Sequence, residues 1–108
     1  MRKVEYLQLP NGHEPVRDWL MELDELTRNR IRAHIYRVAA GGGKKNIRAL
    51  GDSIFEIKMK FGSGYRVYFA EQGKSIVLLL LGGDKGTQER DIEKAKTYWR
   101  EYVSKNYF

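Results

Sequence analysis

One short apolar run constrains the fold more than any other feature of this chain. Residues 76–81 read Ile-Val-Leu-Leu-Leu-Leu, with Gln72-Gly73-Lys74 before them and Gly82-Gly83 after them. This length is typical of a buried strand and falls short of the ~18 residues that a membrane-spanning helix needs. Because the run is apolar on both faces, we expect Ser75–Leu81 to form a central strand covered on two sides.

Two more strands are predicted directly before this run, over Ile54–Phe61 and Tyr65–Ala70. Both segments alternate apolar and polar side chains, the pattern of strands with one buried face. The first places its charged side chains, Glu56, Lys58 and Lys60, on the face opposite its apolar ones. Gly62-Ser63-Gly64 is a suitable three-residue hairpin loop. Together with the apolar run, these segments predict a three-stranded antiparallel meander.

The rest of the chain predicts one strand and three helices. Arg2–Leu9 is expected to be a strand that ends at a Pro10-Asn11-Gly12 turn. A short helix follows from Glu14-Pro15, and a second begins at an Asp24 N-cap and ends at Gly41-Gly42-Gly43. The last helix begins near Thr87. The order strand, helical hairpin, three-stranded antiparallel meander and helix predicts a single α+β domain over residues 1–108.

Composition narrows the class of protein. The chain has no cysteine and no segment with the features of a signal peptide, so we expect a soluble protein of the cytoplasm. Its formal net charge is +6, and residues 41–66 hold 6 basic and only 2 acidic side chains. These six cations are Lys44, Lys45, Arg48, Lys58, Lys60 and Arg66. A basic surface of this kind favours a polyanionic partner.

The predicted hairpin concentrates this charge. With Gly62–Gly64 as the loop, Lys60 faces Arg66 and Lys58 faces Tyr68, all on one side of the two strands. Like charges directly opposite each other destabilise a sheet, so this face is expected to bind an anion. A solvated outer face with extended lysines is the alternative.

Such a face carries the parts needed to cleave RNA without a metal or cofactor. A lysine among other cations has a lowered pKa and can act as a base. Arginine stays charged and can hold a phosphate through two nitrogens. A tyrosine such as Tyr68 can stack on a base or donate a proton.

Other chemistries fit less well. His13 and His34 lie far apart in the sequence, and no cluster of potential ligands has the spacing of a metal site. The stretch Gly82–Thr87 lacks the full spacing of a phosphate-binding loop, and no parallel strand–helix–strand unit surrounds it.

The ordered combination of three segments resembles the RelE/ParE toxin superfamily, and within it the HigB-type branch of phage-derived killer proteins. These segments are Ile54–Lys58, Gly64–Phe69 and Leu79–Gln88, followed by Ile92–Ala95. The resemblance spans nearly the whole chain, from Val4 to Trp99. It implies a concave basic face that enters the ribosomal A site and cuts mRNA. It also implies a cognate helix-turn-helix antitoxin.

The resemblance also implies roles for single residues. Arg66 matches a strand arginine that contacts the scissile phosphate, and Lys58 falls where the superfamily has arginine or lysine. Lys85 matches a basic residue after the last strand, and Gln88 completes that stretch. With Lys60, these cations form the predicted catalytic set, and Tyr68, Lys44, Lys45, Arg48 and Gln88 form the predicted RNA-binding set.

The chain departs from the superfamily at three places. Asp84 stands where an apolar residue is common. Lys85-Gly86 stands where two adjacent basic residues are common. The late tyrosines Tyr98, Tyr102 and Tyr107 occupy no matching motif, so the general base stays open among lysines and tyrosines.

Three functions are compatible with these features. The first is a toxin that cleaves mRNA on the ribosome, and the second is a ParE-like toxin that binds DNA gyrase without cutting RNA. The third is a basic RNA-binding domain without catalysis. The fold alone does not separate the first two.

Overall fold

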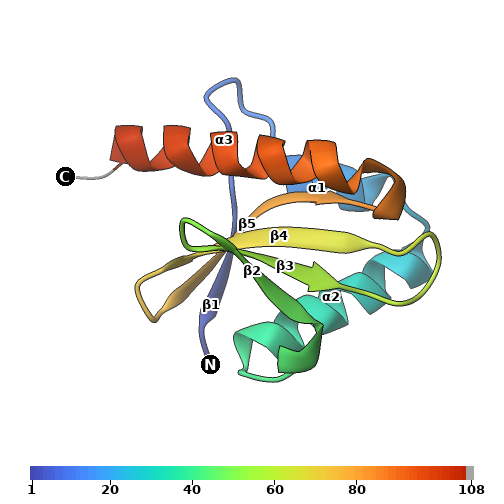
Figure 1. The fold of residues 1–108 in the computed structure, drawn as a ribbon. Coiled ribbons are helices and arrows are strands. Elements are labelled where there is room, and N and C mark those ends of the chain that lie inside the picture. The colour runs from blue at the N-terminus through green and yellow to red at the C-terminus, as the bar shows by residue number, and fades with distance from the viewer. Residues whose placement is uncertain (107–108) are drawn as a thin grey trace.

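A five-stranded sheet forms the middle of the molecule in the computed structural model, which describes residues 1–106 (Figure 1). The strand order is β1-β5-β4-β3-β2. The strands are β1 (Lys3–Tyr6), β2 (Ile47–Gly51), β3 (Ile54–Lys58), β4 (Arg66–Gln72) and β5 (Ile76–Gly83). β1 runs parallel to β5 at one edge, and the other neighbours are antiparallel.

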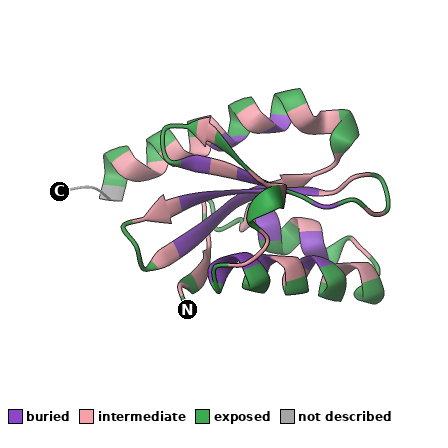
Figure 2. Cartoon of the chain, turned by 60° about the horizontal axis from the view of Figure 1, so that its bottom comes forward, coloured by how far each residue is buried: buried purple, intermediate pink, exposed green. Residues whose placement is uncertain are grey.

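Helices cover both faces of this sheet, as the apolar run predicts. α1 (Pro15–Met21) and α2 (Glu25–Ala39) pack on one face, and α3 (Gln88–Asn106) packs on the other (Figure 1). β5 serves both layers, because Val77 and Leu79 join the core beneath α1 and α2 while Leu78 and Leu80 join the core beneath α3. Figure 2 shows the buried inner sides of the helices and their exposed outer sides. The predicted α+β class and central strand are therefore confirmed.

The second helix begins where its capping residue predicts. The Asp24 carboxylate accepts a hydrogen bond from the Thr27 backbone N–H at 3.1 Å and another from the Thr27 hydroxyl at 2.6 Å. These bonds lower the pKa of Asp24. Among the described residues, no helix is long and apolar enough to cross a membrane.

One strand was missed by the sequence prediction, and several element boundaries differ from it. β2 was not predicted, because this edge strand exposes Arg48 and Ala49 and lacks a clear alternation. The first strand ends at Tyr6 instead of Leu9, and β5 continues through Gly82 and Gly83. Thr87 belongs to a short 3-10 helix, η2 (Lys85–Thr87), whose N-cap is Asp84.

The hairpin register also differs, by two residues. Lys58 pairs with Arg66 and Glu56 pairs with Tyr68, whereas Lys60 lies beyond the end of β3. A shift of two residues keeps every side chain on its predicted face. The connection is wider than a tight hairpin because the Phe61 and Tyr65 rings pack against each other and against His34 and Trp19.

Two glycines at the end of β5 allow the layers to approach closely. A Cβ atom at Gly82 would lie 2.2 Å from the Trp19 ring of α1, and one at Gly83 would lie 2.0 Å from an Asp91 oxygen of α3. Both distances are too short for a real carbon atom. The two glycines therefore allow α1 and α3 to pack closely against β5.

We predict that Gly82→Ala destabilises the protein by about 2 kcal/mol, because the added carbon overpacks the contact with Trp19. Urea unfolding followed by tryptophan fluorescence measures this loss. Gly86→Ala is the matched control, since its added carbon meets only an Asp84 side-chain oxygen at 3.2 Å. Equal stability of the two variants would contradict the close packing.

Candidate functional site

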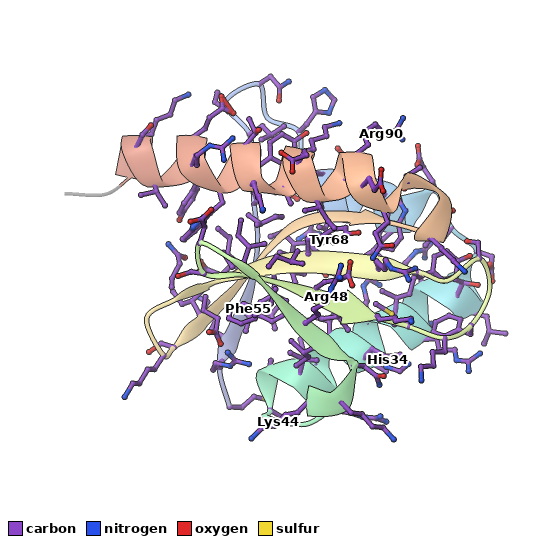
Figure 3. All side chains as sticks on the ribbon, viewed as in Figure 1. His34, Lys44, Arg48, Phe55, Tyr68 and Arg90 are labelled. Carbon is purple, nitrogen blue, oxygen red and sulfur yellow. The ribbon has the colours of Figure 1, made fainter. Side chains whose placement is uncertain are left out.

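Five of the predicted site residues line one pocket of about 360 Å³. The pocket lies where β2 begins, β3 ends, β4 begins and α3 begins. Its lining residues are Lys45, Asn46, Ile47, Arg48, Glu56, Lys58, Arg66 and Gln88. Lys45 and Asn46 come from the short helix η1 (Lys44–Asn46) that precedes β2. Figure 3 labels Arg48 on β2 at this part of the sheet.

Arg66 forms the floor of the pocket. The residue is only 4% exposed, because it starts β4 on the face beneath α3. Its Nη1 donates a hydrogen bond to the Gly64 carbonyl at 2.6 Å, which ties it to the hairpin connection. Its Nε has no hydrogen-bond partner among the described residues, although it lies 3.9 Å from a Glu56 carboxylate oxygen. Arg66 Nε is itself buried, so an anion in the pocket would meet the Nη groups, of which only Nη1 has a hydrogen-bond partner among the described residues.

Glu56 is the acidic residue at the centre of this site, and it is 3% exposed. Its Oε2 accepts a hydrogen bond from Gln88 Nε2 at 2.8 Å and a longer one from Arg48 Nη2 at 3.4 Å. The same oxygen is the one nearest Arg66 Nε. A buried guanidinium without a counter-charge is costly, so Glu56 makes the buried Arg66 possible.

The pocket keeps an excess of positive charge after this pairing. Four cations line it, from Lys45, Arg48, Lys58 and Arg66, against the single carboxylate of Glu56. Lys45 and Lys58 are exposed and have no carboxylate within 4.0 Å in residues 1–106. A hollow with this charge is suited to a phosphate group.

Tyr68 lies next to the pocket but not in it. Its side chain is fully buried beneath α3 and pairs across the sheet with Glu56 (Figure 3). Burial, with the nearby Glu56 and Asp91 carboxylates, holds the pKa of Tyr68 well above its ordinary value. No face of this ring is open for stacking on a base in the structure.

The remaining predicted residues do not line the pocket. Lys85 is exposed in η2, and its backbone N–H donates to the Ser63 carbonyl at 3.4 Å, so it borders the same hairpin connection that holds Arg66. Lys60 is exposed in that connection. Lys44 lines a separate hollow beside the C-terminal end of α2.

Two of the late tyrosines, Tyr98 and Tyr102, are not part of the pocket. Tyr98 and Tyr102 pack against the core beneath α3. Tyr107 lies outside the described residues. No three histidine or acidic side chains gather closely enough within residues 1–106 to hold a metal ion.

Glu56 is the site residue that sequence reasoning missed. The strand alternation placed it on the same face as Lys58, but nothing in the pattern indicated that it is buried. A single carboxylate among cations in a strand was the available signal, because a buried arginine needs such a partner.

The fold and the pocket define a small α+β protein with a basic hollow at one end of its sheet. Residues 18–101 match the family model described as Phage derived protein Gp49-like (DUF891), so the chain belongs to this family, which is part of the RelE/HigB-type toxin superfamily. The chain is also 43% identical over 79 residues to an uncharacterized protein of Haemophilus influenzae. That match covers 72% of this chain and 79% of the relative.

We predict that Glu56→Ala destabilises the protein by about 3 kcal/mol, because it leaves Arg66 buried without a counter-charge. Glu56→Gln should cost less, since an amide oxygen can still accept from Gln88. Urea unfolding measures both effects. Glu93→Ala, which removes an exposed glutamate of α3, is the control. If Glu56→Ala costs no more than this control, Glu56 does not compensate Arg66.

Proposed function

We propose that this protein is the toxin of a toxin–antitoxin pair, of the HigB type, and that it cleaves mRNA on the ribosome. The observation that carries the proposal is the pocket of about 360 Å³ that is lined by Arg66, Lys58, Arg48 and Lys45. Membership of the Gp49-like family supports the toxin class, because this family often supplies toxins of toxin–antitoxin pairs.

The proposed reaction is attack by the ribose 2′-hydroxyl on the adjacent phosphorus. The 2′-oxygen forms a bond to phosphorus, the bond from phosphorus to the 5′ oxygen breaks, and the products end in a 2′,3′-cyclic phosphate and a 5′-hydroxyl. Negative charge grows on the phosphate oxygens during this step. Fixed cations stabilise that charge where water would have to reorganise.

The position of each residue suggests its role in the proposed cleavage reaction. Arg66, held by Gly64 and Glu56, presents its remaining donors from the floor to a phosphate oxygen. Lys58 and Arg48 approach from the more exposed side of the pocket. Of the two lysines beside the proposed phosphate position, Lys58 and Lys85, one in its neutral form takes the proton from the 2′-hydroxyl, and the other in its charged form gives a proton to the leaving 5′ oxygen.

The proposed partners of the protein follow from the proposed cleavage of mRNA. The substrate is mRNA on the ribosome, which places the protein in the cytoplasm. A cognate helix-turn-helix antitoxin is proposed to neutralise it. A short neighbouring gene for such an antitoxin would support the toxin class.

We predict that induced expression arrests growth and creates new 5′ ends in mRNA, and that Lys58→Ala lowers the cleavage rate on purified ribosomes by about 100-fold. Lys58 is exposed, so this change should leave stability unchanged. Arg66→Ala should also relieve growth arrest. Arg66→Lys keeps the positive charge but removes the guanidinium group, so it separates the loss of hydrogen-bond donors from the loss of charge.

Lys94→Ala is the matched control, because it removes an exposed lysine from α3. Full cleavage by Lys58→Ala and Arg66→Lys would contradict the proposed site. Growth arrest with DNA damage signalling and no new mRNA ends would instead indicate a ParE-like toxin that binds gyrase.

A further inference from the structure

A second basic surface lies outside the pocket, on the outer side of α2. Residues 26–51 contain seven basic side chains and no acidic one. Two of the seven make hydrogen bonds to other residues of the protein. Arg28 donates to the Leu20 and Leu23 carbonyls, and Arg48 donates to Glu56. The other five have no carboxylate within 4.0 Å among residues 1–106, and they are Arg30, Arg32, Arg37, Lys44 and Lys45.

Helical spacing lines up part of this charge. Arg30, His34 and Arg37 follow one another at intervals of four and three residues, so they share one side of α2. Arg30 and Arg37 are exposed and about 10 Å apart along the helix axis. The pKa of His34 is lowered mainly by burial, and then by the positive charges of Arg37 and Arg30. Both arginines therefore lie close to its ring.

The basic side of α2 continues to the pocket. After α2 the chain passes through Gly41–Gly43 into η1, where Lys44 and Lys45 are exposed. Lys44 lines a hollow with Val38 at the end of α2, whereas Lys45 lines the pocket that holds Arg66. Figure 3 labels His34 and Lys44 on this side of the molecule.

The other end of this surface carries an ordered aromatic cluster. The Arg30 guanidinium lies 4.0 Å above the centre of the Phe61 ring, and the His34 ring stacks on Phe61 with centres 5.8 Å apart and an angle of 24°. Tyr65 contacts the same ring with centres 5.5 Å apart. Because Phe61 holds Arg30 in place, the exposed guanidinium offers a flat surface without a further loss of side-chain freedom.

This combination favours RNA over an acidic protein. A peptide rich in carboxylates needs only charge, and flexible lysines would serve it. Here the cations of the helix are all arginines, and an arginine plane held on an aromatic ring is a surface on which a nucleobase stacks. Unpaired like charges on one helix side also repel each other, and a chain of phosphates removes that cost.

We propose that Arg30, Arg37, Lys44 and Phe61 form a second RNA-binding surface, which holds the phosphates of a single-stranded segment and stacks one base on the Arg30–Phe61 pair. The inference deepens the proposed function and rests on it for the class of ligand. The segment bound on α2 is continuous with, or adjacent to, the RNA in the pocket. This surface anchors RNA and takes no part in the cleavage step.

The test measures binding of a fluorescein-labelled, 20-nucleotide 2′-O-methyl RNA to the full chain by fluorescence anisotropy. This RNA keeps its phosphates and bases but has no 2′-hydroxyl to attack phosphorus, so binding is separated from cleavage. The test variant is Arg30→Gln with Arg37→Gln, since glutamine preserves the helix. The control is Arg100→Gln with Lys105→Gln, which removes two exposed charges near the end of α3.

We expect the α2 variant to bind this RNA at least 10-fold more weakly than the control at ~0.1 M salt. The slope of log Kd against log salt should fall by about 1.4, because each lost phosphate contact on a single strand contributes ~0.7. Phe61→Leu should weaken binding to RNA but not to inorganic polyphosphate, which has charge and no bases.

Equal losses in the α2 and α3 variants would show a general effect of net charge and overturn the proposal. Loss of binding to a 20-residue polyglutamate peptide, with RNA binding retained, would assign the surface to an acidic protein and also overturn it. If the RNA surface is confirmed while Lys58→Ala still cleaves mRNA on ribosomes at full rate, the proposed cleavage site fails and the surface stands.

Discussion

The buried pair of Arg66 and Glu56 is the interaction on which the candidate site depends. A guanidinium that is 4% exposed would be expelled from the sheet without a counter-charge, and Glu56 supplies it from the neighbouring strand. The same carboxylate orients Arg48 from β2 and Gln88 from α3. One acidic side chain thus joins three strands and a helix around a basic hollow, so the positions of the cations are set before any anion arrives.

Much of the fold follows from local sequence patterns. The features that could not be predicted depend on contacts between residues far apart in the sequence. The alternation in β3 and β4 placed every side chain on its correct face, and the apolar run identified β5. The register and the edge strand β2 could not be predicted in this way. The register is set by the packing of Phe61 and Tyr65 on α1 and α2, and β2 is an edge strand with two exposed side chains in a row.

The sequence indicated residues that line the candidate pocket, but not how they are arranged. Lys45, Arg48, Lys58, Arg66 and Gln88 are spread over 44 positions of the sequence and line one pocket. Charge and the family resemblance identified them. Neither indicates burial, so the role of Glu56, the depth of Arg66 and the enclosure of Tyr68 were beyond sequence reasoning. The basic segment 41–66 begins inside the acid-free stretch 26–51. Its charge count therefore left out the basic residues of α2.

The central claim is that the pocket floor at Arg66 receives a phosphate of RNA. Nitrogen-15 NMR of the arginine Nε–H groups tests it most directly, with Arg66→Lys and Arg48→Lys to assign the signals. On addition of the uncleavable 2′-O-methyl RNA, the Arg66 and Arg48 signals should shift and saturate together. Shifts confined to the arginines of α2 and α3, with the Arg66 signal unchanged, would contradict the claim that RNA phosphate enters this pocket.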